Sequence, residues 1–200
     1  MKHLIAVGLC ALISACSLPP IASATEYYSG TETLPMFSSI TTQVDAGQSV
    51  VFTETGGGIY ATCAVSAIKG QIYQGSATST VTMPVSSVSF GNCTSSVTAK
   101  GSGTIEIHHL SGTANGTMTT SEEFQIALHI PPPFSGECLY GSKVGSDLGK
   151  VTGATGAATH GIIDLTGVLS LISGFPCVGD IVWSGTYTIA LPHKLNVRAS

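Results

Sequence analysis

From residue 47 to the C-terminus, short runs of β-branched and aromatic residues alternate with turn residues. The runs 50–55, 124–130 and 180–190 are typical, and Gly56-Gly57-Gly58 and Pro131-Pro132-Pro133 end the first two of them. Outside residues 1–24 no useful length of sequence follows the helical period of 3.6, and no segment repeats at a fixed period. Strands at short, regular spacing predict an all-β fold, an antiparallel β-sandwich or a partly closed barrel.

The same pattern gives the expected strand boundaries. Further strands are predicted at 59–65, 80–83, 85–90, 104–110, 162–165, 168–172 and 195–198. Pro84 is expected to end one strand, Thr166-Gly167 to form a turn, and Asn115-Gly116 to form a hairpin turn. Residues 141–161 read as loop because they are small and rich in glycine.

Composition restricts the class of protein. Only 9% of the 200 residues are charged, against roughly 25% in an average soluble domain, while 43% are hydrophobic, enough for a core. The net charge of −4 argues against a nucleic-acid partner, which needs clustered Lys and Arg. We expect an export signal over 1–24, an irregular lead-in over 25–45 that Pro35 interrupts, and a single β domain over 46–200.

The first 24 residues resemble an export signal, with Lys2 followed by an apolar run over 4–15 that is too short to span a bilayer. Two processing routes are open. Ala22-Ser23-Ala24 forms an A-x-A site for cleavage after Ala24, whereas Ile13-Ser14-Ala15-Cys16 resembles a bacterial lipobox, in which Cys16 would carry lipid. Either route predicts a secreted or cell-surface protein in an oxidising compartment. No later segment is apolar enough to span a membrane.

Four cysteines remain beyond the leader: Cys63, Cys93, Cys138 and Cys177. An even number in an exported chain predicts two disulfides with three possible pairings. We favour Cys63–Cys93 and Cys138–Cys177, which close loops of moderate length. Without a C-x-x-C motif, a zinc or redox site is disfavoured.

No group of residues predicts a reaction. Glu106 and His108 are the best same-face pair for a metal, but surface or structural histidines are the simpler interpretation. The carboxylates are scattered, and the G-x-S-x-G motif of hydrolases is absent. We therefore predict no enzyme, no cofactor and no metal. Trp183 and Tyr187 share one face of the last long strand, where they serve either the core or an exposed apolar contact.

Two segments suggest a family. Val88-Ser89-Phe90-Gly91-Asn92-Cys93 and the closing strand Trp183-Ser184-Gly185-Thr186-Tyr187, with the late Cys177, resemble small exported bacterial proteins of the alkane-oxidation activator type and their secreted relatives. The resemblance covers the layout of residues 45–198. It implies a secreted or surface-associated, non-catalytic factor that assists the use of hydrophobic substrates such as alkanes, or the assembly of biofilm matrix.

Two alternatives remain open. A fimbrial or adhesin subunit would assemble by strand donation, although this chain lacks a penultimate aromatic residue and has more disulfides than such subunits usually carry. A membrane-anchored lipoprotein with a binding function would follow from lipid at Cys16. The expected partner is an apolar surface or a second copy of the chain. A surface-active factor should expose an apolar patch, a fibre subunit an unprotected strand edge, and an enzyme a pocket with converging titratable groups.

Overall fold

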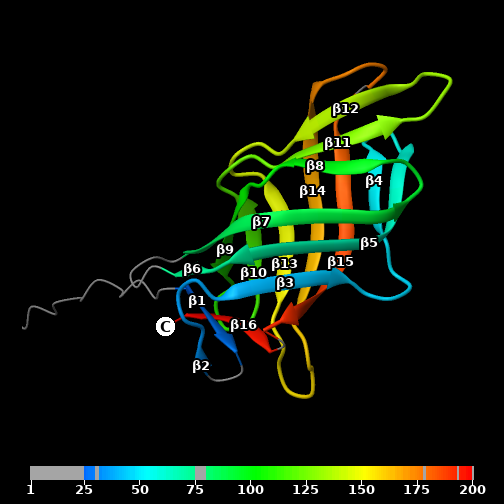
Figure 1. Cartoon of the computed structure of the whole chain (residues 1–200). Coiled ribbons are helices and arrows are strands. Elements are labelled where there is room, and N and C mark those ends of the chain that lie inside the picture. The colour runs from blue at the N-terminus through cyan, green and yellow to red at the C-terminus, as the bar shows by residue number, and fades with distance from the viewer. Residues whose placement is uncertain (1–24, 30–31, 75–79, 178, 193, 200) are drawn as a thin grey trace, which may run out of the picture.

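The protein is all-β, as predicted. A computed structural model of the chain describes residues 25–29, 32–74, 80–177, 179–192 and 194–199, and these contain strands, turns and bends but no helix (Figure 1). The strands are β1 (Thr25–Ser29), β2 (Glu32–Thr33), β3 (Ser39–Val44), β4 (Val50–Glu54), β5 (Ile59–Gln71), β6 (Tyr73–Gln74), β7 (Thr80–Cys93), β8 (Val97–Gly101), β9 (Thr104–His109), β10 (Gly116–Thr120), β11 (Gln125–Ile130), β12 (Gly136–Gly141), β13 (Asp147–Thr152), β14 (Ile162–Ser173), β15 (Ile181–Leu191) and β16 (Leu195–Ala199).

One half of the large sheet closes on itself. Starting at β3, antiparallel ladders run through β5, β7, β9, β10, β13, β14 and β15, and β15 pairs again with β3. Within each strand, buried and exposed side chains alternate; Val81, Met83 and Val85 of β7 point inward. The closed ring therefore surrounds a core of aliphatic side chains. Because every strand of the ring turns one face toward this apolar core, the fold can form with few charged residues.

In the other half, the long strands continue and change partners. β4 lies between β5 and the first part of β15, while the last part of β14 pairs with β12, followed by β11 and β8. Figure 1 shows β8, β11 and β12 together at the top of the molecule, above β7. Two sheets face each other here, and an aromatic cluster of Phe52, Phe90, Phe124 and Trp183 fills the space between them.

The segment expected to be an irregular lead-in is instead ordered as strands. β3 belongs to the closed ring, and β1 pairs along its length with β16 and briefly with β2. Tyr27 of β1 is fully buried. Sequence analysis missed these strands because Thr, Ser and Gln dominate them, and their pairing depends on the distant C-terminal residues.

Three loop or turn predictions were wrong for the same kind of reason. β13 lies within the segment expected to be a loop. β7 continues through Pro84, which is the last residue to pair with β9 and lies one residue beyond the ladder with β5, where a missing N–H is tolerated. β14 runs unbroken through Thr166-Gly167. Gly167 does not form a turn there. A Cβ at this position would lie 2.8 Å from a methyl carbon of Leu148, so the glycine allows that leucine to pack against the strand.

The hairpin predicted around Asn115-Gly116 exists, but its turn lies earlier. The N–H of Thr113 bonds to the carbonyl of Leu110, and Gly116 is already the first residue of β10, paired with His109. A Cβ added to Gly116 would lie only 2.9 Å from the side chain of Ile107. A glycine is therefore needed at position 116 for this close packing and not to form a two-residue turn.

Candidate functional site

Both predicted disulfides are present. Cys63–Cys93 joins directly opposed residues of β5 and β7, with their Cα atoms 3.9 Å apart. Cys138–Cys177 joins β12 to the segment before β15, with a Cα separation of 5.8 Å. Two structural disulfides are consistent with a protein that folds outside the cytoplasm.

The leader and its cleavage or lipidation sites, Ala24 and Cys16, lie outside the described residues. Within the part of the chain that is described, no helix is long and apolar enough to cross a membrane.

Trp183 and Tyr187 are core residues. Trp183 is 1% exposed and stacks on Phe52 at a ring distance of 6.1 Å. Tyr187 is fully buried, and its hydroxyl lies 3.0 Å from the Ser66 Oγ. Their shared face is therefore the inner one, and neither ring forms the exposed apolar contact that was the alternative interpretation.

Because of its buried tyrosines, the protein should lose stability at alkaline pH. Burial raises the pKa of Tyr187 to about 12, although its hydrogen bond with Ser66 opposes the shift, and burial raises the pKa values of Tyr27 and Tyr140 further. Below pH 10 these side chains are neutral in both states, so they add no pH dependence. Above pH 10 the unfolded chain ionises first, and stability falls as pH rises.

We therefore expect the free energy of unfolding to fall between pH 10 and pH 12, with Tyr187 alone contributing roughly 3 kcal/mol. Urea unfolding at a series of pH values measures the fall, and tyrosinate absorbance follows ionisation. Tyr187→Phe should reduce the slope. Ionisation of all tyrosines while the protein remains folded would contradict this expectation.

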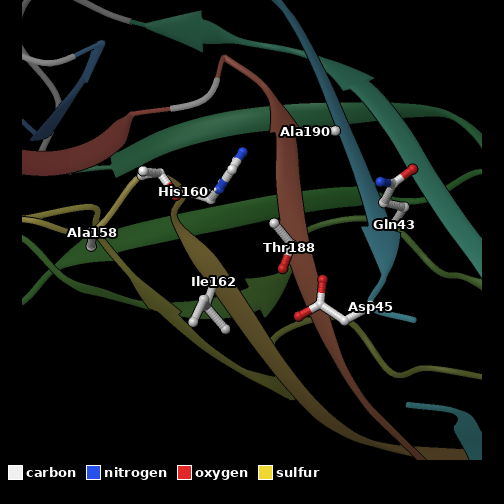
Figure 2. Close-up of a pocket in the computed structure, with 8 residues that line it drawn as sticks. Gln43, Asp45, Ala158, His160, Ile162, Thr188 and Ala190 are labelled. Atoms are coloured by element: carbon white, nitrogen blue, oxygen red, sulfur yellow. Dashed lines mark hydrogen bonds between the residues drawn. The ribbon is translucent and has the colours of Figure 1, made fainter. Parts of the chain in front are cut away.

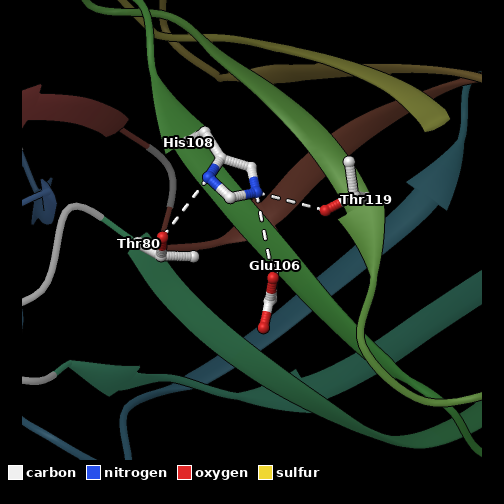
Figure 3. Close-up of polar contacts among 4 residues, drawn as sticks. All are labelled: Thr80, Glu106, His108 and Thr119. Atoms are coloured by element: carbon white, nitrogen blue, oxygen red, sulfur yellow. Dashed lines mark hydrogen bonds and ion pairs between the residues drawn. The ribbon is translucent and has the colours of Figure 1, made fainter. Parts of the chain in front are cut away.

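Glu106 and His108 lie together on the outer face of β9, as their spacing predicted (Figure 3). The His108 Nε2 atom is 3.1 Å from the Thr119 Oγ1 and 3.9 Å from the Glu106 Oε2, and its Nδ1 atom is 3.3 Å from the Thr80 Oγ1. The imidazole bridges three neighbouring strands through threonine hydroxyls. Among the described residues, no three His, Cys, Asp or Glu side chains gather as a metal site.

The other polar groups singled out in the sequence also serve local structure. His109 Nε2 lies 2.8 Å from the carbonyl oxygen of Thr113, within its own hairpin. Glu122 accepts a hydrogen bond of 2.7 Å from the Thr104 hydroxyl. The structure therefore brings together Glu106 with His108, but not the scattered carboxylates.

An open hollow of about 540 Å³ lies on the outer face of β3, β14 and β15. Figure 2 shows Asp45 and His160 on either side of Thr188, with Ile162 beside them. The Thr159 hydroxyl lies 2.8 Å from the His160 Nδ1. All these side chains are exposed or half-buried, so water reaches the hollow.

A second hollow, of about 300 Å³, separates β7 from β8. Its lining residues are mostly small: Ser86, Ser87, Val88, Ala99, Lys100, Gly101 and Ser102. No hydrogen-bonded ladder joins β7 to β8 anywhere in the described part of the chain. Sequence analysis could not find this feature, because only strand pairing reveals which edges stay unpaired.

Among the described residues, the large hydrophobic side chain with the highest exposed fraction lies at an apolar tip, formed by residues 130–134 and 172–176. Phe134 is 63% exposed and Phe175 is 80% exposed. The two segments are adjacent, because Gly136 packs so closely against Phe175 and Pro176 that it leaves no room for a Cβ. Neither segment contains a charged residue. In the sequence, Pro131-Pro132-Pro133 had been interpreted only as the end of a strand.

Comparisons of the chain with protein-family models, with curated proteins and with solved structures found no match.

Proposed function

We propose that this is an exported, non-catalytic protein, secreted or held at the cell surface, that attaches to hydrophobic material such as alkane droplets. The observation that supports the proposal is the apolar tip. Phe134 and Phe175 project from a rigid all-β body, and burying a phenylalanine side chain in an apolar phase is worth about 1.5–3 kcal/mol. Assistance in the use of hydrophobic substrates, or in building a matrix on them, follows from such attachment.

The tip is held in place by its surroundings. The Cys138–Cys177 disulfide fixes the segment that carries Phe175 to β12, while Phe134 lies in the connection between β11 and β12. Gly174 packs directly against the backbone of Glu137 and Cys138. Because these segments are already ordered, little conformational entropy is lost when the phenylalanines enter an apolar phase.

Polar contacts elsewhere do not suggest a competing reaction. The Glu106–His108 pair bridges strands, and the hollow beside Asp45 and His160 is open to water. The tip has no charged residue of its own and is flanked by the exposed Lys100–Glu137 ion pair, an arrangement that suits a protein that orients at an interface between water and hydrocarbon.

Replacing both tip phenylalanines by serine should lower the affinity for hexadecane droplets by at least about tenfold. Loss of even one well-buried phenylalanine exceeds the 1.4 kcal/mol that corresponds to a factor of ten. The measurement is depletion of the protein from buffer as droplet area increases, for the wild type and for Phe134→Ser/Phe175→Ser.

The matched control replaces two exposed apolar residues away from the tip, Val144 and Leu191, by serine. The control variant should bind droplets like the wild type. Equal losses in both variants, or unchanged binding after loss of both phenylalanines, would overturn the assignment of the tip. Far-ultraviolet circular dichroism verifies that each variant is folded.

A further inference from the structure

The two sheets of the upper half fail to meet at β7 and β8. From β7 the ladders run through β5, β4 and β15 to β14, and from there through β12 and β11 to β8. β9 pairs with β7 only from Thr80 to Pro84. Figure 1 shows β8 running above β7, with no strand between them. We call the space between these two edges the β7–β8 slot, and the 300 Å³ hollow is its part beside residues 86–88 and 99–102.

Backbone groups of β7 point into this slot. Cys63 and Cys93 oppose each other with Cα atoms 3.9 Å apart, which identifies a pair that does not exchange ladder hydrogen bonds. Such pairs recur at every second residue of an unshifted register, so Ser87, Ser89 and Gly91 belong to the same class. Their N–H and C=O groups are therefore directed away from β5 and toward β8.

Backbone groups of β8 also point into the slot. The N–H of His129 donates to the carbonyl of Ser96 at 2.9 Å, which marks a hydrogen-bonded pair between this strand and β11. Hydrogen-bonded and non-hydrogen-bonded pairs alternate along this ladder, so the pairs at Val97 and Ala99 are not hydrogen-bonded. The backbone groups of Val97 and Ala99 are therefore directed into the slot from the opposite side.

Both walls of the slot are fixed. The Cys63–Cys93 disulfide ties the end of β7 to β5, and at the other end the N–H of Val85 donates to the carbonyl of Gly103 at 3.0 Å. The chain reverses at residues 94–96, so β7 and β8 run in opposite directions. A strand inserted between them would be antiparallel to one wall and parallel to the other.

We propose that the β7–β8 slot binds an extended segment of another protein, which adds to the sheet as a strand. The N–H and C=O groups on both walls belong to no ladder, and an extended backbone offers the pattern of donors and acceptors that matches them. Neighbouring core residues restrict the side chains of the bound segment. Val97 and Phe90 of the two walls already pack in the core, so inward positions of the segment have to be small. Lys100, paired with Glu137 at 3.6 Å, is the sole charged lining residue of the slot in the described structure.

Hydrogen exchange of assigned amides tests the proposal in two stages. In the free protein the slot-facing amides of Ser87 and Ser89 should exchange at least about 100-fold faster than those of Val88 and Phe90, which bond to β5. Blocked peptides of about six residues, the usual strand length, in which Thr alternates with Gly, Ala or Val, serve as probes. At least one of the three should slow exchange at Ser87, Ser89, Val97 and Ala99 by about tenfold or more.

Ser89→Pro removes a slot-facing N–H without removing a ladder bond to β5, and it should abolish the protection. Ala99→Pro does the same on the other wall and replaces it if Ser89→Pro does not fold. The control is Val144→Pro. Val144 precedes Gly145, which has a φ of 78°, in a turn closed by the Ser146 N–H to the Lys143 carbonyl, a place where proline is favoured. Val144→Pro should retain the protection.

Three outcomes would overturn the proposal. The first is that none of the peptides protects these amides. The second is that the amides are already protected in the free protein at every concentration, which would mean that the two walls bond to each other. The third is protection that grows with protein concentration alone, which would assign the slot to a second copy of this chain. The proposal does not rest on the apolar tip, so Phe134→Ser/Phe175→Ser should leave peptide protection unchanged.

Discussion

Replacing Trp183 by alanine should lower the free energy of unfolding by about 3–5 kcal/mol. The indole is buried between the two sheets of the upper half, stacked on Phe52 and edge-on to Phe90 at 5.8 Å and to Phe124 at 6.4 Å. These rings come from separate strands and loops, and alanine would leave a cavity that β-sheets cannot readily collapse to fill.

Chemical denaturation followed by far-ultraviolet circular dichroism measures this loss. Fluorescence is unsuitable because Trp183 is the sole tryptophan of the chain. The control is Phe175→Ala, which removes an aromatic ring that is 80% exposed and should change stability by no more than about 0.5 kcal/mol. A loss below about 1 kcal/mol in Trp183→Ala would show that the aromatic cluster does not join the sheets.

Removing either disulfide should cost about 4 kcal/mol. The cysteines are 30 and 39 residues apart in the sequence, and loops of this size lose about that much closure entropy from the unfolded chain when cross-linked. The variants are Cys63→Ala/Cys93→Ala and Cys138→Ala/Cys177→Ala. Alanine avoids placing a hydroxyl at Cys63 and Cys138, which are fully buried.

Urea unfolding of each double variant, beside the wild type with and without reductant, measures the effect. Reduction of the wild type should lower the unfolding midpoint by more than the removal of either disulfide alone. Thiol titration of the denatured, unreduced mature protein should detect no free thiol. An unchanged midpoint after reduction would contradict the entropic account, and a free thiol would contradict the pairing in the isolated protein.

The sequence predicted much of the local structure. The run 180–190 became β15, 124–130 became β11 and 104–110 became β9, each within one or two residues. In these runs bulky side chains occur at every second position, and this period matches the two faces of a strand whatever the strand later pairs with. Glu106 and His108 were placed together for the same reason.

The elements that were missed depend on their partners. β1, β3 and β13 are short and polar, and their sequences carry little alternation. β1 forms because β16, from the other end of the chain, supplies its ladder. Pro84 and Gly167, which act as breakers in an isolated chain, are accommodated by a position at the end of a ladder and by the packing of Leu148. No local pattern contains this information.

The apolar tip and the β7–β8 slot also differ in how far the sequence predicts them. The composition of the apolar tip was visible in the sequence as uncharged Pro and Phe residues, but its exposure and the adjacency of its two segments depend on tertiary contacts around Gly136. The β7–β8 slot has no sequence signal at all, because the strands that flank it resemble paired strands.

Residue types and a period of two were therefore enough to predict the all-β class and two disulfides, and loop length favoured the pairing that the structure contains. Where the sheet closes, which strand edges no ladder joins and which aromatic rings are buried follow only from the three-dimensional arrangement. These outcomes depend on pairing between residues far apart in the chain, such as β3 with β15 and β1 with β16. Trp183 and Phe175 illustrate the point, because both are large aromatic residues near the C-terminus, yet one anchors the core and the other faces the solvent.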